Sequence, residues 1–388
     1  MMNKAALEPS ISFEYATRSV WDALVIGAGP AGAFAAYKIA KCGMSVLLVD
    51  RSPFPRYKVC GCCLNAAALK MLAGEGLFAM PELAEAVPLT EYCLSVQGSV
   101  LRIRLPAGAA LSREQFDTAV LRAAMGAGAH FMPSTAAAVG EAEDQYRLVH
   151  IASNGARGTL RARVVIVADG IGGRALASVP GFQPSVSPLS RIGAGTMTWS
   201  DQEHYRAGTI YMACTDGNYV GVVRLPDGRL DLAAAFEPRF LKQSGSPGAA
   251  AERTLQAAGL APISGIRDLH WQGTVPLNRS RRRIAAYRLF VIGDAALYVE
   301  PFTGEGIAWA LWSADTVTPL VAEAIKDWRV DLPERWQSIH HRNIGRHSRV
   351  ARIVGSVLRQ NTVTAGLCKV FGMVPGLAEP LVKYINEL

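Results

Sequence analysis

The sequence predicts an α/β protein in which a parallel-sheet domain is interrupted by an inserted antiparallel β-sheet domain and followed by a helical C-terminal region. A strand, a glycine-rich loop, a helix and a second strand occupy residues 22–50. Short buried strands recur near residues 164 and 290, and the block 190–235 holds short strands without helices between them. Strands that alternate with helices are typical of parallel sheets, whereas strands joined by tight turns are typical of antiparallel sheets.

Composition and length agree with a folded globular chain. Of the 388 residues, 50% are hydrophobic and 19% are charged, so the chain can bury a large core. No apolar stretch reaches the roughly 18–20 residues that a membrane-spanning helix needs, and residues 1–20 lack the apolar centre of a signal peptide. The seven cysteines are an odd number and do not suggest a disulfide framework. We therefore expect a cytoplasmic protein.

The formal net charge of +8 favours anionic cofactors or acidic partners. The densest basic run spans residues 279–283 and has no aromatic residues between its arginines, which is more typical of a solvated loop than of a nucleic-acid surface. We therefore expect no nucleic-acid partner.

The loop within residues 22–50 has the spacing of a dinucleotide-binding unit. Gly27, Gly29 and Gly32 follow an apolar run at G-x-G-x-x-G spacing. The first glycine permits a tight turn, the second lets the backbone approach a pyrophosphate, and the third lets helix and strand pack closely. Asp50 ends the second strand, where an acid accepts hydrogen bonds from both ribose hydroxyls. With strand, helix and acid in place, the unit predicts a Rossmann-like domain.

The helices and strands after residue 60 are predicted from apolar periodicity, from glycine and proline breakers, and from capping residues. Gly98 and Ser99 favour a hairpin turn, and Ser112 with Gln115 forms a capping box at the start of a helix. In chain order, we expect a helix within 61–85, a hairpin over 92–105, a helix over 112–125, a buried strand over 164–170, short antiparallel strands over 190–235, a helix over 247–259, a strand over 289–293, a helix over 304–325 and mostly helices over 326–388. The first and last strands are expected to share a sheet.

Three further segments resemble signatures of one flavoprotein family. Residues 290–311 read FVIGDAALYVEPFTGEGIAWAL and resemble the second FAD signature of the p-hydroxybenzoate-hydroxylase-like flavoproteins. Residues 164–176 read VVIVADGIGGRAL and resemble their Asp-Gly motif, although Gly173 stands where Ser is common. Arg113, in LSREQFDTAVL, stands where an Arg or Gln of the family touches FAD. The chain thus resembles the family of FAD-dependent monooxygenases, flavin-dependent halogenases and geranylgeranyl reductases.

The resemblance implies an FAD site assembled from distant parts of the chain. By this resemblance, Asp294 holds a ribityl hydroxyl and the loop 301–306 opens a helix that faces the flavin ring. Free N–H groups of that helix would stabilise negative charge on reduced flavin. NADPH or NADH is the implied electron donor, with a separate flavin reductase as an alternative. The residues expected to contact FAD are Gly27, Gly29, Pro30, Ala31, Gly32, Asp50, Arg51, Lys58, Cys60, Gly61, Arg113, Asp169, Gly170, Gly293, Asp294, Pro301, Gly304, Glu305, Gly306 and Ile307.

Residues 50–65, DRSPFPRYKVCGCCLN, resemble a stretch that lies close to the flavin in family members. Within it, Cys60 and Cys63 have C-x-x-C spacing. Three interpretations stay open: small residues that let the backbone approach the ring, a redox dithiol, and a metal pair. Because no second cysteine or histidine cluster has ligand spacing, we expect no metal site.

The elements and the resemblance together divide the chain into a discontinuous FAD-binding domain, a substrate domain and a C-terminal helical region. The FAD-binding domain takes residues 21–90, 112–180 and 280–325, the substrate domain takes 91–111 and 181–279, and the C-terminal region takes 326–388.

The resemblance favours a monooxygenase that hydroxylates an aromatic substrate through a flavin C4a-hydroperoxide. The substrate would be a small molecule or a carrier- or protein-bound group, such as a tryptophan side chain. No side chain is an obvious catalytic base, and each candidate is also explained as ordinary core or surface. The weak candidates for the substrate pocket are Trp199, His204, Tyr211, Tyr219, His270 and Trp271.

Three alternatives remain. A geranylgeranyl-reductase-like enzyme would reduce an isoprenoid double bond and would need a long apolar tunnel. The stretch 350–384 could form that tunnel or a membrane-surface helix, although ordinary helical core is expected there. A halogenase is disfavoured because residues 219–226, YVGVVRLP, lack the tryptophans of the halogenase motif. A non-enzymatic flavin-binding assembly factor is disfavoured by the intact Gly-Glu-Gly loop at 304–306.

Overall fold

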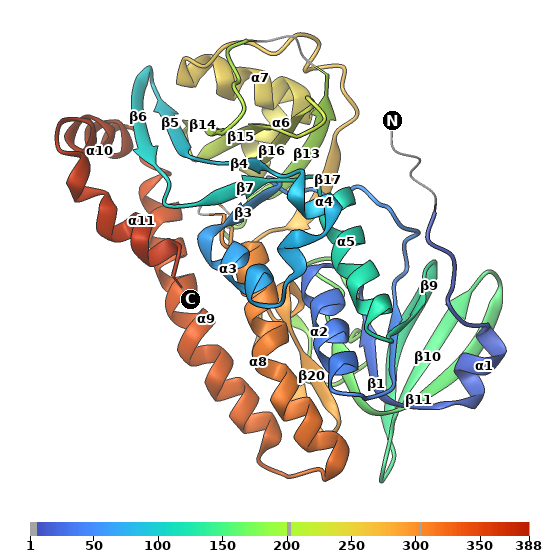
Figure 1. Cartoon of the computed structure of the whole chain (residues 1–388). Helices are drawn as coiled ribbons and strands as arrows, with labels where there is room; N and C mark the ends of the chain where they lie inside the picture. The colour runs from blue at the N-terminus through green and yellow to red at the C-terminus, as the bar shows by residue number, and fades with distance from the viewer. Residues whose placement is uncertain (1–5, 200–202, 301, 303, 388) are drawn as a thin grey trace.

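A central β-sheet organises the larger lobe of the protein. The computed structural model describes residues 6–199, 203–300, 302 and 304–387. The sheet has eight strands in the order β19-β20-β11-β1-β2-β8, to which β10 and β9 are attached (Figure 1). The first and last predicted strands share it, with β11 between them, as expected. The strands are β1 (Val20–Ile26), β2 (Val46–Val49), β8 (His130–Met132), β9 (Thr135–Ala142), β10 (Arg147–Ser153), β11 (Ala156–Val167), β19 (Ala285–Ala286) and β20 (Leu289–Val291).

Parallel pairing at the centre of this sheet follows from burial of its strands. Ala23 pairs in parallel with Val46 on one side and with Val164 on the other. Near-continuous apolar strands of this kind are typical of parallel sheets that helices cover. The helices over one face (Figure 1) are α2 (Pro30–Lys41), α5 (Arg113–Gly126) and α8 (Gly306–Lys326). Ser112 caps α5, because its hydroxyl accepts a hydrogen bond from the Gln115 N–H at 3.2 Å, as predicted.

A seven-stranded sheet in the order β17-β13-β16-β15-β14-β5-β6 forms the second lobe. Its pairs are antiparallel, as predicted, except that β14 and β5 run parallel. These two strands come from different insertions, and a parallel pair needs the long connection that the first lobe provides. Helices α6 (Pro238–Ser244) and α7 (Pro247–Ala258) cover one face (Figure 1). The strands are β5 (Glu91–Val96), β6 (Ser99–Arg104), β13 (Ile192–Thr198), β14 (Thr209–Thr215), β15 (Asn218–Arg224), β16 (Leu230–Phe236) and β17 (Gln272–Pro276).

Two small sheets and several short helices complete the two lobes. The sheets have the orders β3-β7-β4 and β12-β18-β21. Their strands are β3 (Cys63–Asn65), β4 (Val87–Pro88), β7 (Gly108–Ala110), β12 (Pro184–Val186), β18 (Arg279–Arg281) and β21 (Leu297–Tyr298). The short helices are α1 (Phe13–Arg18), α3 (Ala66–Gly74), α4 (Pro81–Ala84) and the 3-10 turns η1 (Leu77–Ala79) and η2 (Gly293–Ala295).

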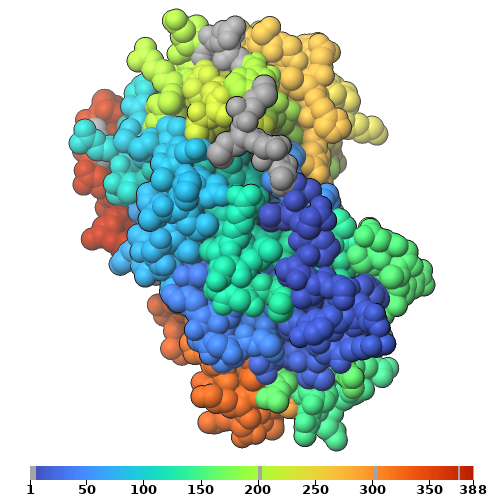
Figure 2. All heavy atoms as spheres, turned by 45° about the vertical axis from the view of Figure 1, so that its right-hand side comes forward, coloured from blue at the N-terminus to red at the C-terminus, as the bar shows by residue number. Residues whose placement is uncertain are grey.

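The C-terminal region is helical, and it lies along one edge of the molecule (Figure 1). Its elements are α9 (Leu332–Val357), α10 (Asn361–Met373), η3 (Pro375–Leu377) and α11 (Glu379–Ile385). Trp336 anchors α9 on the first lobe, since its buried indole N–H donates to the Val291 carbonyl at 3.0 Å. Figure 2 shows the second lobe stacked on the first, with the red C-terminal helices at the left rim. None of the helices in the described ranges is long and apolar enough to cross a bilayer. The boundaries of the three predicted parts stay a prediction.

Candidate functional site

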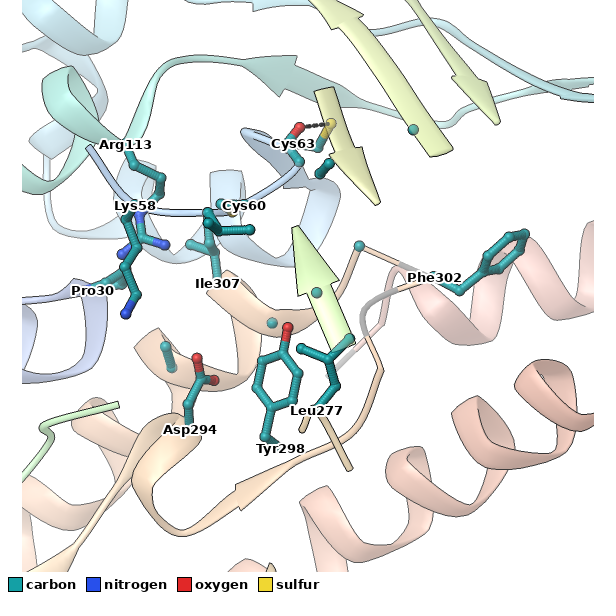
Figure 3. Close-up of a pocket in the computed structure, with 18 of the residues that line it drawn as sticks. Pro30, Lys58, Cys60, Cys63, Arg113, Leu277, Asp294, Tyr298, Phe302 and Ile307 are labelled. Atoms are coloured by element: carbon teal, nitrogen blue, oxygen red, sulfur yellow. Dashed lines mark hydrogen bonds between the residues drawn. The ribbon is translucent and has the colours of Figure 1, made fainter. Parts of the chain in front are cut away.

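A cavity of about 880 Å³ lies where the two lobes meet the C-terminal helices. The loops after β1, β2 and β11 line one part of it, and strands of the second sheet together with α9, α10 and α11 line another. In Figure 3, Lys58, Arg113 and Asp294 lie on one side and Phe302 lies on the other, near the C-terminal helices. Ligands of open α/β sheets bind beyond the carboxyl ends of the strands, which is where the first part lies.

Three glycines shape the loop after β1. A Cβ atom on Gly27, whose φ is +102°, would lie 2.4 Å from the Ala168 carbonyl oxygen. A Cβ atom on Gly32 would lie 1.8 Å from the Gly27 carbonyl oxygen, so the helix could not pack at this distance with any other residue. At Gly29 the space is open toward the cavity, apart from two guanidinium groups at 3.7 and 3.8 Å. The loop therefore leaves its backbone free to contact a ligand.

Those two guanidinium groups belong to Arg56 and Arg113. Arg113 donates from Nε and Nη2 to the two carboxylate oxygens of Asp117, at 2.7 and 2.8 Å. Asp117 is buried and also lies 3.2 Å from Nη1 of Arg56. One carboxylate therefore orients two cations beside the glycine loop, an arrangement suited to a pyrophosphate. Arg56 was not among the predicted contacts, although its place in the Phe-Pro-Arg stretch was a usable signal.

Asp50 is held in position by the backbone. Its Oδ2 accepts from the Ala28 N–H at 2.7 Å, and its Oδ1 accepts from the Ser52 N–H at 2.8 Å. Each carboxylate oxygen can accept a second hydrogen bond. The carboxylate lines the cavity, so both ribose hydroxyls could be accommodated there. Pro30, Ala31 and Arg51 line the same part of the cavity.

The Asp-Gly motif after β11 explains why Gly173 replaces the Ser that is common in the family. The Asp169 carboxylate folds back over its own loop, where Oδ2 accepts from the Ala175 N–H at 2.9 Å. A Cβ atom on Gly173 would lie 1.9 Å from the carboxyl carbon of Asp169. Burial raises the pKa of Asp169, and Oδ1 has no hydrogen-bond partner among the described residues. Asp169 and Gly170 both line the cavity.

Asp294 faces the cavity from η2. No described group donates a hydrogen bond to its carboxylate, and burial raises its pKa to about 6, with Arg113 and Lys58 opposing the shift. Burial likewise lowers the pKa of Lys58, with Arg113 adding to the decrease and Asp294 opposing it. Gly293 has φ +58°, and a Cβ atom there would lie 2.8 Å from the Ala31 side chain. This close approach brings Asp294 up to the glycine loop.

The loop before α8 was predicted to face the flavin. Gly304 has φ +73° and α8 begins at Gly306, and both glycines line the cavity together with Ile307. Glu305 is buried, with its Oε1 3.3 Å from Nδ1 of His347 on α9. Pro301, which completes the predicted motif, lies outside the described residues.

The cysteine-containing segment 60–63 packs against the second sheet, where Cys62 clusters with Val223 and Leu225. Cys60, Cys62 and Cys63 are free thiols, and the Cys63 thiol donates to the Gly61 carbonyl at 2.8 Å. Cys60 and Gly61 line the cavity, and burial raises the pKa of Cys60 although the neighbouring Arg113 opposes the shift. Within the described ranges no group of histidine, cysteine and acidic residues could hold a metal ion.

Sequence reasoning missed a buried acid on the cavity wall, Asp231 of β16. Burial raises its pKa to about 8, opposed by the Cys62 thiol and by Arg229 and Arg113. Tyr57 shares this region, and its buried hydroxyl has its pKa raised by burial and by Asp231. The usable signal was one charged residue inside an otherwise apolar strand, LDLAAAF.

Aromatic and aliphatic side chains form the second part of the cavity. Phe302 packs edge-on against Tyr92 and Tyr219, with ring centroids 6.2 and 5.4 Å apart. A buried ion pair joins Arg191, the residue before β13 of the second sheet, to Glu300 in the loop that precedes Phe302. This ion pair holds the loop and the sheet together, and so fixes the aromatic wall.

The C-terminal helices complete the apolar part. The stretch 350–384 was expected to be ordinary helical core, with a tunnel or a membrane-surface helix as alternatives. Its apolar residues Val350, Ile353, Val357, Leu367 and Phe371 line the cavity. Val370 is exposed instead. The structure therefore places this stretch on the wall of the cavity.

Of the six weak candidates for the substrate pocket, Tyr219 lines the cavity and the other five do not. Tyr211 and Trp271 pack in the core between the second sheet and α7, where the Trp271 indole N–H donates to the Ile266 carbonyl at 3.1 Å. Trp199 is 72% exposed. His204 and His270 are also exposed. Most of the described residues predicted to contact FAD line the cavity, whereas Gly32, Gly293 and Glu305 do not, and neither do five of these six candidates.

Fold and site together define a flavoprotein of the two-lobed, nucleotide-binding kind. The chain belongs to the FAD binding domain family, which matches residues 21–333. The site fits FAD on structural grounds, because it combines a glycine-rich loop with an open approach to the backbone at Gly29, two oriented guanidinium groups, and the carboxylates of Asp169 and Asp294 with free acceptor capacity. The protein is therefore an FAD-dependent oxidoreductase.

The chain is similar in sequence to two kinds of reductase and similar in fold to several solved flavoproteins. The chain is 27% identical to a menaquinone reductase of Mycobacterium tuberculosis over 87% of this chain and 84% of the relative. It is 25% identical to a digeranylgeranylglycerophospholipid reductase of Methanocaldococcus jannaschii over 86% and 87% of the two chains. Its fold matches a geranylgeranyl bacteriochlorophyll reductase-like protein of Thermoplasma acidophilum (TM-score 0.76, 19% identity, 91% and 92% covered). It also matches a flavin-dependent brominase (TM-score 0.80, 14% identity, 95% and 94% covered).

Proposed function

We propose that this protein is a reductase that uses FAD to reduce a carbon–carbon double bond in an isoprenoid lipid. The observation that carries the proposal is the continuity of the cavity, which runs from the nucleotide loops into an apolar compartment walled by the C-terminal helices. Its volume, about 880 Å³, is near the upper end of ordinary ligand pockets. Two of the relatives above are named for menaquinone and for a digeranylgeranylglycerophospholipid, both molecules with isoprenoid chains, which supports the same class of substrate.

The nucleotide part of the cavity would hold FAD. Asp50 would accept hydrogen bonds from the adenosine ribose, Arg56 and Arg113 would neutralise the pyrophosphate, and Asp294 would accept from a ribityl hydroxyl. When bound, FAD would supply the hydride that reduction of a double bond requires. The N-terminus of α8 would place N–H groups and a positive dipole end near the ring. The proposed electron donor is NADPH or NADH, with a flavin reductase as the alternative.

The apolar part would hold the isoprenoid chain. Leu277, Phe302 and Leu367 line it, and burial of an apolar chain against such residues is favourable by roughly 25 cal/mol per Å². Water exclusion would protect the reacting double bond and would strengthen electrostatic effects at the ring. A long apolar compartment suits a chain-like substrate better than a compact polar one.

Aromatic hydroxylation is the second candidate, on a small molecule or on a carrier- or protein-bound group. The observation that favours it is the aromatic wall of Tyr92, Tyr219 and Phe302, against which an aromatic ring could pack. We place it second because the apolar cavity extends well beyond that wall, into the C-terminal helices.

Anaerobic reoxidation of the reduced protein separates the candidates. The purified protein is reduced without oxygen, an isoprenoid lipid or a short isoprenoid alcohol is added, and the flavin spectrum and products are followed. Reoxidation with a saturated product is the expected result. Product formation only after oxygen is admitted with an aromatic acceptor would favour hydroxylation instead. A halide-dependent product would favour a halogenase, and no turnover with any acceptor would favour a non-enzymatic role.

A further inference from the structure

Exposed apolar side chains are concentrated at the turn between α10 and α11. The segment 370–378, here called the C-terminal tip, contains no charged residue and lies between Lys369 and Glu379. Val370, Met373, Val374 and Leu377 are 43%, 75%, 51% and 55% exposed. Isolated exposed apolar residues are normal in water-soluble proteins, but four within eight positions form a patch that calls for a partner.

The two helices that flank the tip, α10 and α11, are each tied to the rest of the protein at the end away from the tip. At the start of α10, the Asn361 side chain donates to the Asp216 carboxylate at 2.7 Å. At the end of α11, the Asn65 side chain donates to the Ile385 carbonyl at 3.2 Å. These contacts tie the segment to the second sheet and to α3, so the apolar tip is presented on a supported scaffold.

The neighbouring helix α9 carries an outward basic stripe, defined by Arg342, Arg346, Arg349 and Arg352. All four are exposed, and their spacing of four, three and three residues places them on one side of the helix. None of them forms an ion pair with an acidic residue in the described ranges. By contrast, Arg335 pairs with Glu323 at 2.9 Å. The stripe is therefore available to an anionic partner.

The same helices form the inner wall of the apolar cavity. Val350, Val354 and Val357 of α9, with Phe371 of α10 and Leu381 of α11, line it. A surface that combines exposed apolar residues with arginines therefore lies over the end of the cavity that an isoprenoid chain would occupy. Interfacial segments of proteins that bind lipid surfaces combine the same two features.

We infer that the C-terminal tip and the basic stripe dock on an anionic lipid bilayer, from which the apolar cavity takes its substrate. The route of the substrate rests on the proposed function, whereas the docking itself does not. A second copy of this chain fits the surface less well, because a two-fold contact through this face would set the two arginine stripes against each other.

Vesicle flotation of the FAD-loaded full-length protein tests this inference, with phosphatidylcholine vesicles that contain or lack phosphatidylglycerol. We expect binding to the anionic vesicles that weakens with salt. R346Q/R349Q should weaken binding by roughly fivefold per arginine. M373S/L377S should weaken it by on the order of tenfold, because apolar contacts with the lipid are lost. This loss should be similar at low and high salt.

Matched controls use exposed residues of the same types elsewhere in the chain. V330S removes an apolar side chain that is 90% exposed at the far end of α9, and R157Q/R161Q removes two exposed arginines of β11. Both controls should bind vesicles as the unaltered protein does. No binding to anionic vesicles, or equal binding by M373S/L377S, would overturn the inference. Self-association that M373S/L377S abolishes, without vesicle binding, would assign the surface to a second copy instead.

Turnover of a short, water-soluble isoprenoid alcohol keeps this inference separate from the proposed function. Met373, Leu377, Arg346 and Arg349 do not line the cavity, so both variants should turn it over at the normal rate. Vesicle binding without any isoprenoid reduction would contradict the proposed function alone. Reduction without vesicle binding would contradict the docking alone.

Discussion

At the scale of single residues, the carboxylates that lie beside arginine and lysine side chains decide which groups of a ligand the site can bind. Asp294 offers a carboxylate to the cavity with no protein donor, beside Arg113 and Lys58. We expect Asp294→Ala to lower FAD affinity by at least roughly tenfold, since a lost hydrogen bond to a charged group costs about 1.5–3 kcal/mol. FAD content after gel filtration measures the effect. Asp294→Asn, which keeps one acceptor oxygen, should lose less, and a fully flavinated Asp294→Ala protein would contradict the assigned role.

Gly173 is required by the position of the Asp169 carboxylate rather than by backbone conformation. Gly173→Ser would force that carboxylate away from the Ala175 N–H, so we expect a loss of about 1–2 kcal/mol in the free energy of unfolding. Gly172→Ser is the matched control, because nothing lies within 4 Å of a Cβ atom there. Denaturant unfolding of the two variants tests the difference, and equal stability would argue against this explanation.

Asp231 makes stability depend on pH. Its folded pKa of about 8 lies above the ordinary value of 3.8, so the folded protein keeps a proton that the unfolded chain releases. Its contribution to stability is therefore full below about pH 4 and is lost as the pH rises through 8. Asp231→Asn should remove this loss and stabilise the protein above pH 8, by on the order of a few kcal/mol. Thermal unfolding at pH 5 and pH 9 measures it, and an equal effect at both values would contradict the prediction.

Helix α10 has one face on the wall of the cavity and another face exposed to solvent. Leu367 faces the cavity, whereas Val363, one turn earlier, is 45% exposed and does not line it. We expect Leu367→Trp to shorten the compartment and to lower kcat/KM for long isoprenoid chains by on the order of tenfold, with less effect on short ones. Val363→Trp, which adds the same bulk outside, should leave the length preference unchanged. Steady-state kinetics on a series of chain lengths checks both, and an unaltered preference in Leu367→Trp would exclude α10 as a wall of the substrate site.

At the scale of the whole molecule, the nucleotide site is assembled from segments that lie far apart in the sequence. The residues proposed to hold FAD come from segments near 27, 50, 113, 169 and 294, which converge only in the folded state. A ligand that binds only the folded state stabilises it by about 2.7 kcal/mol at 100 times its Kd. We therefore expect removal of FAD to lower the Tm and its restoration to raise it with FAD concentration, as calorimetry would measure. A Tm independent of FAD would contradict an FAD site built from these loops.

Much of the nucleotide half could be predicted because its signals are local. The second strand of the nucleotide unit, β2, ends next to Asp50 as predicted, and the Ser112 cap is present where the capping box placed it. Most strands of the second lobe were also predicted, although β17 was not. The parallel pairing of β14 with β5 was not predicted either, since it joins segments separated by the first lobe.

The sequence by itself determined the nucleotide loop, the order of strands and helices, and the family, because glycine spacing, caps and apolar periodicity act between near neighbours. Only the tertiary structure decided which side chains face the cavity. Met212 lines it while the adjacent Tyr211 packs in the α7 core, because successive residues of a strand point to opposite faces. The pairing of Arg56 with Asp117, the burial of Asp231 and the apolar wall of C-terminal helices likewise depend on contacts between distant segments, which no local pattern encodes.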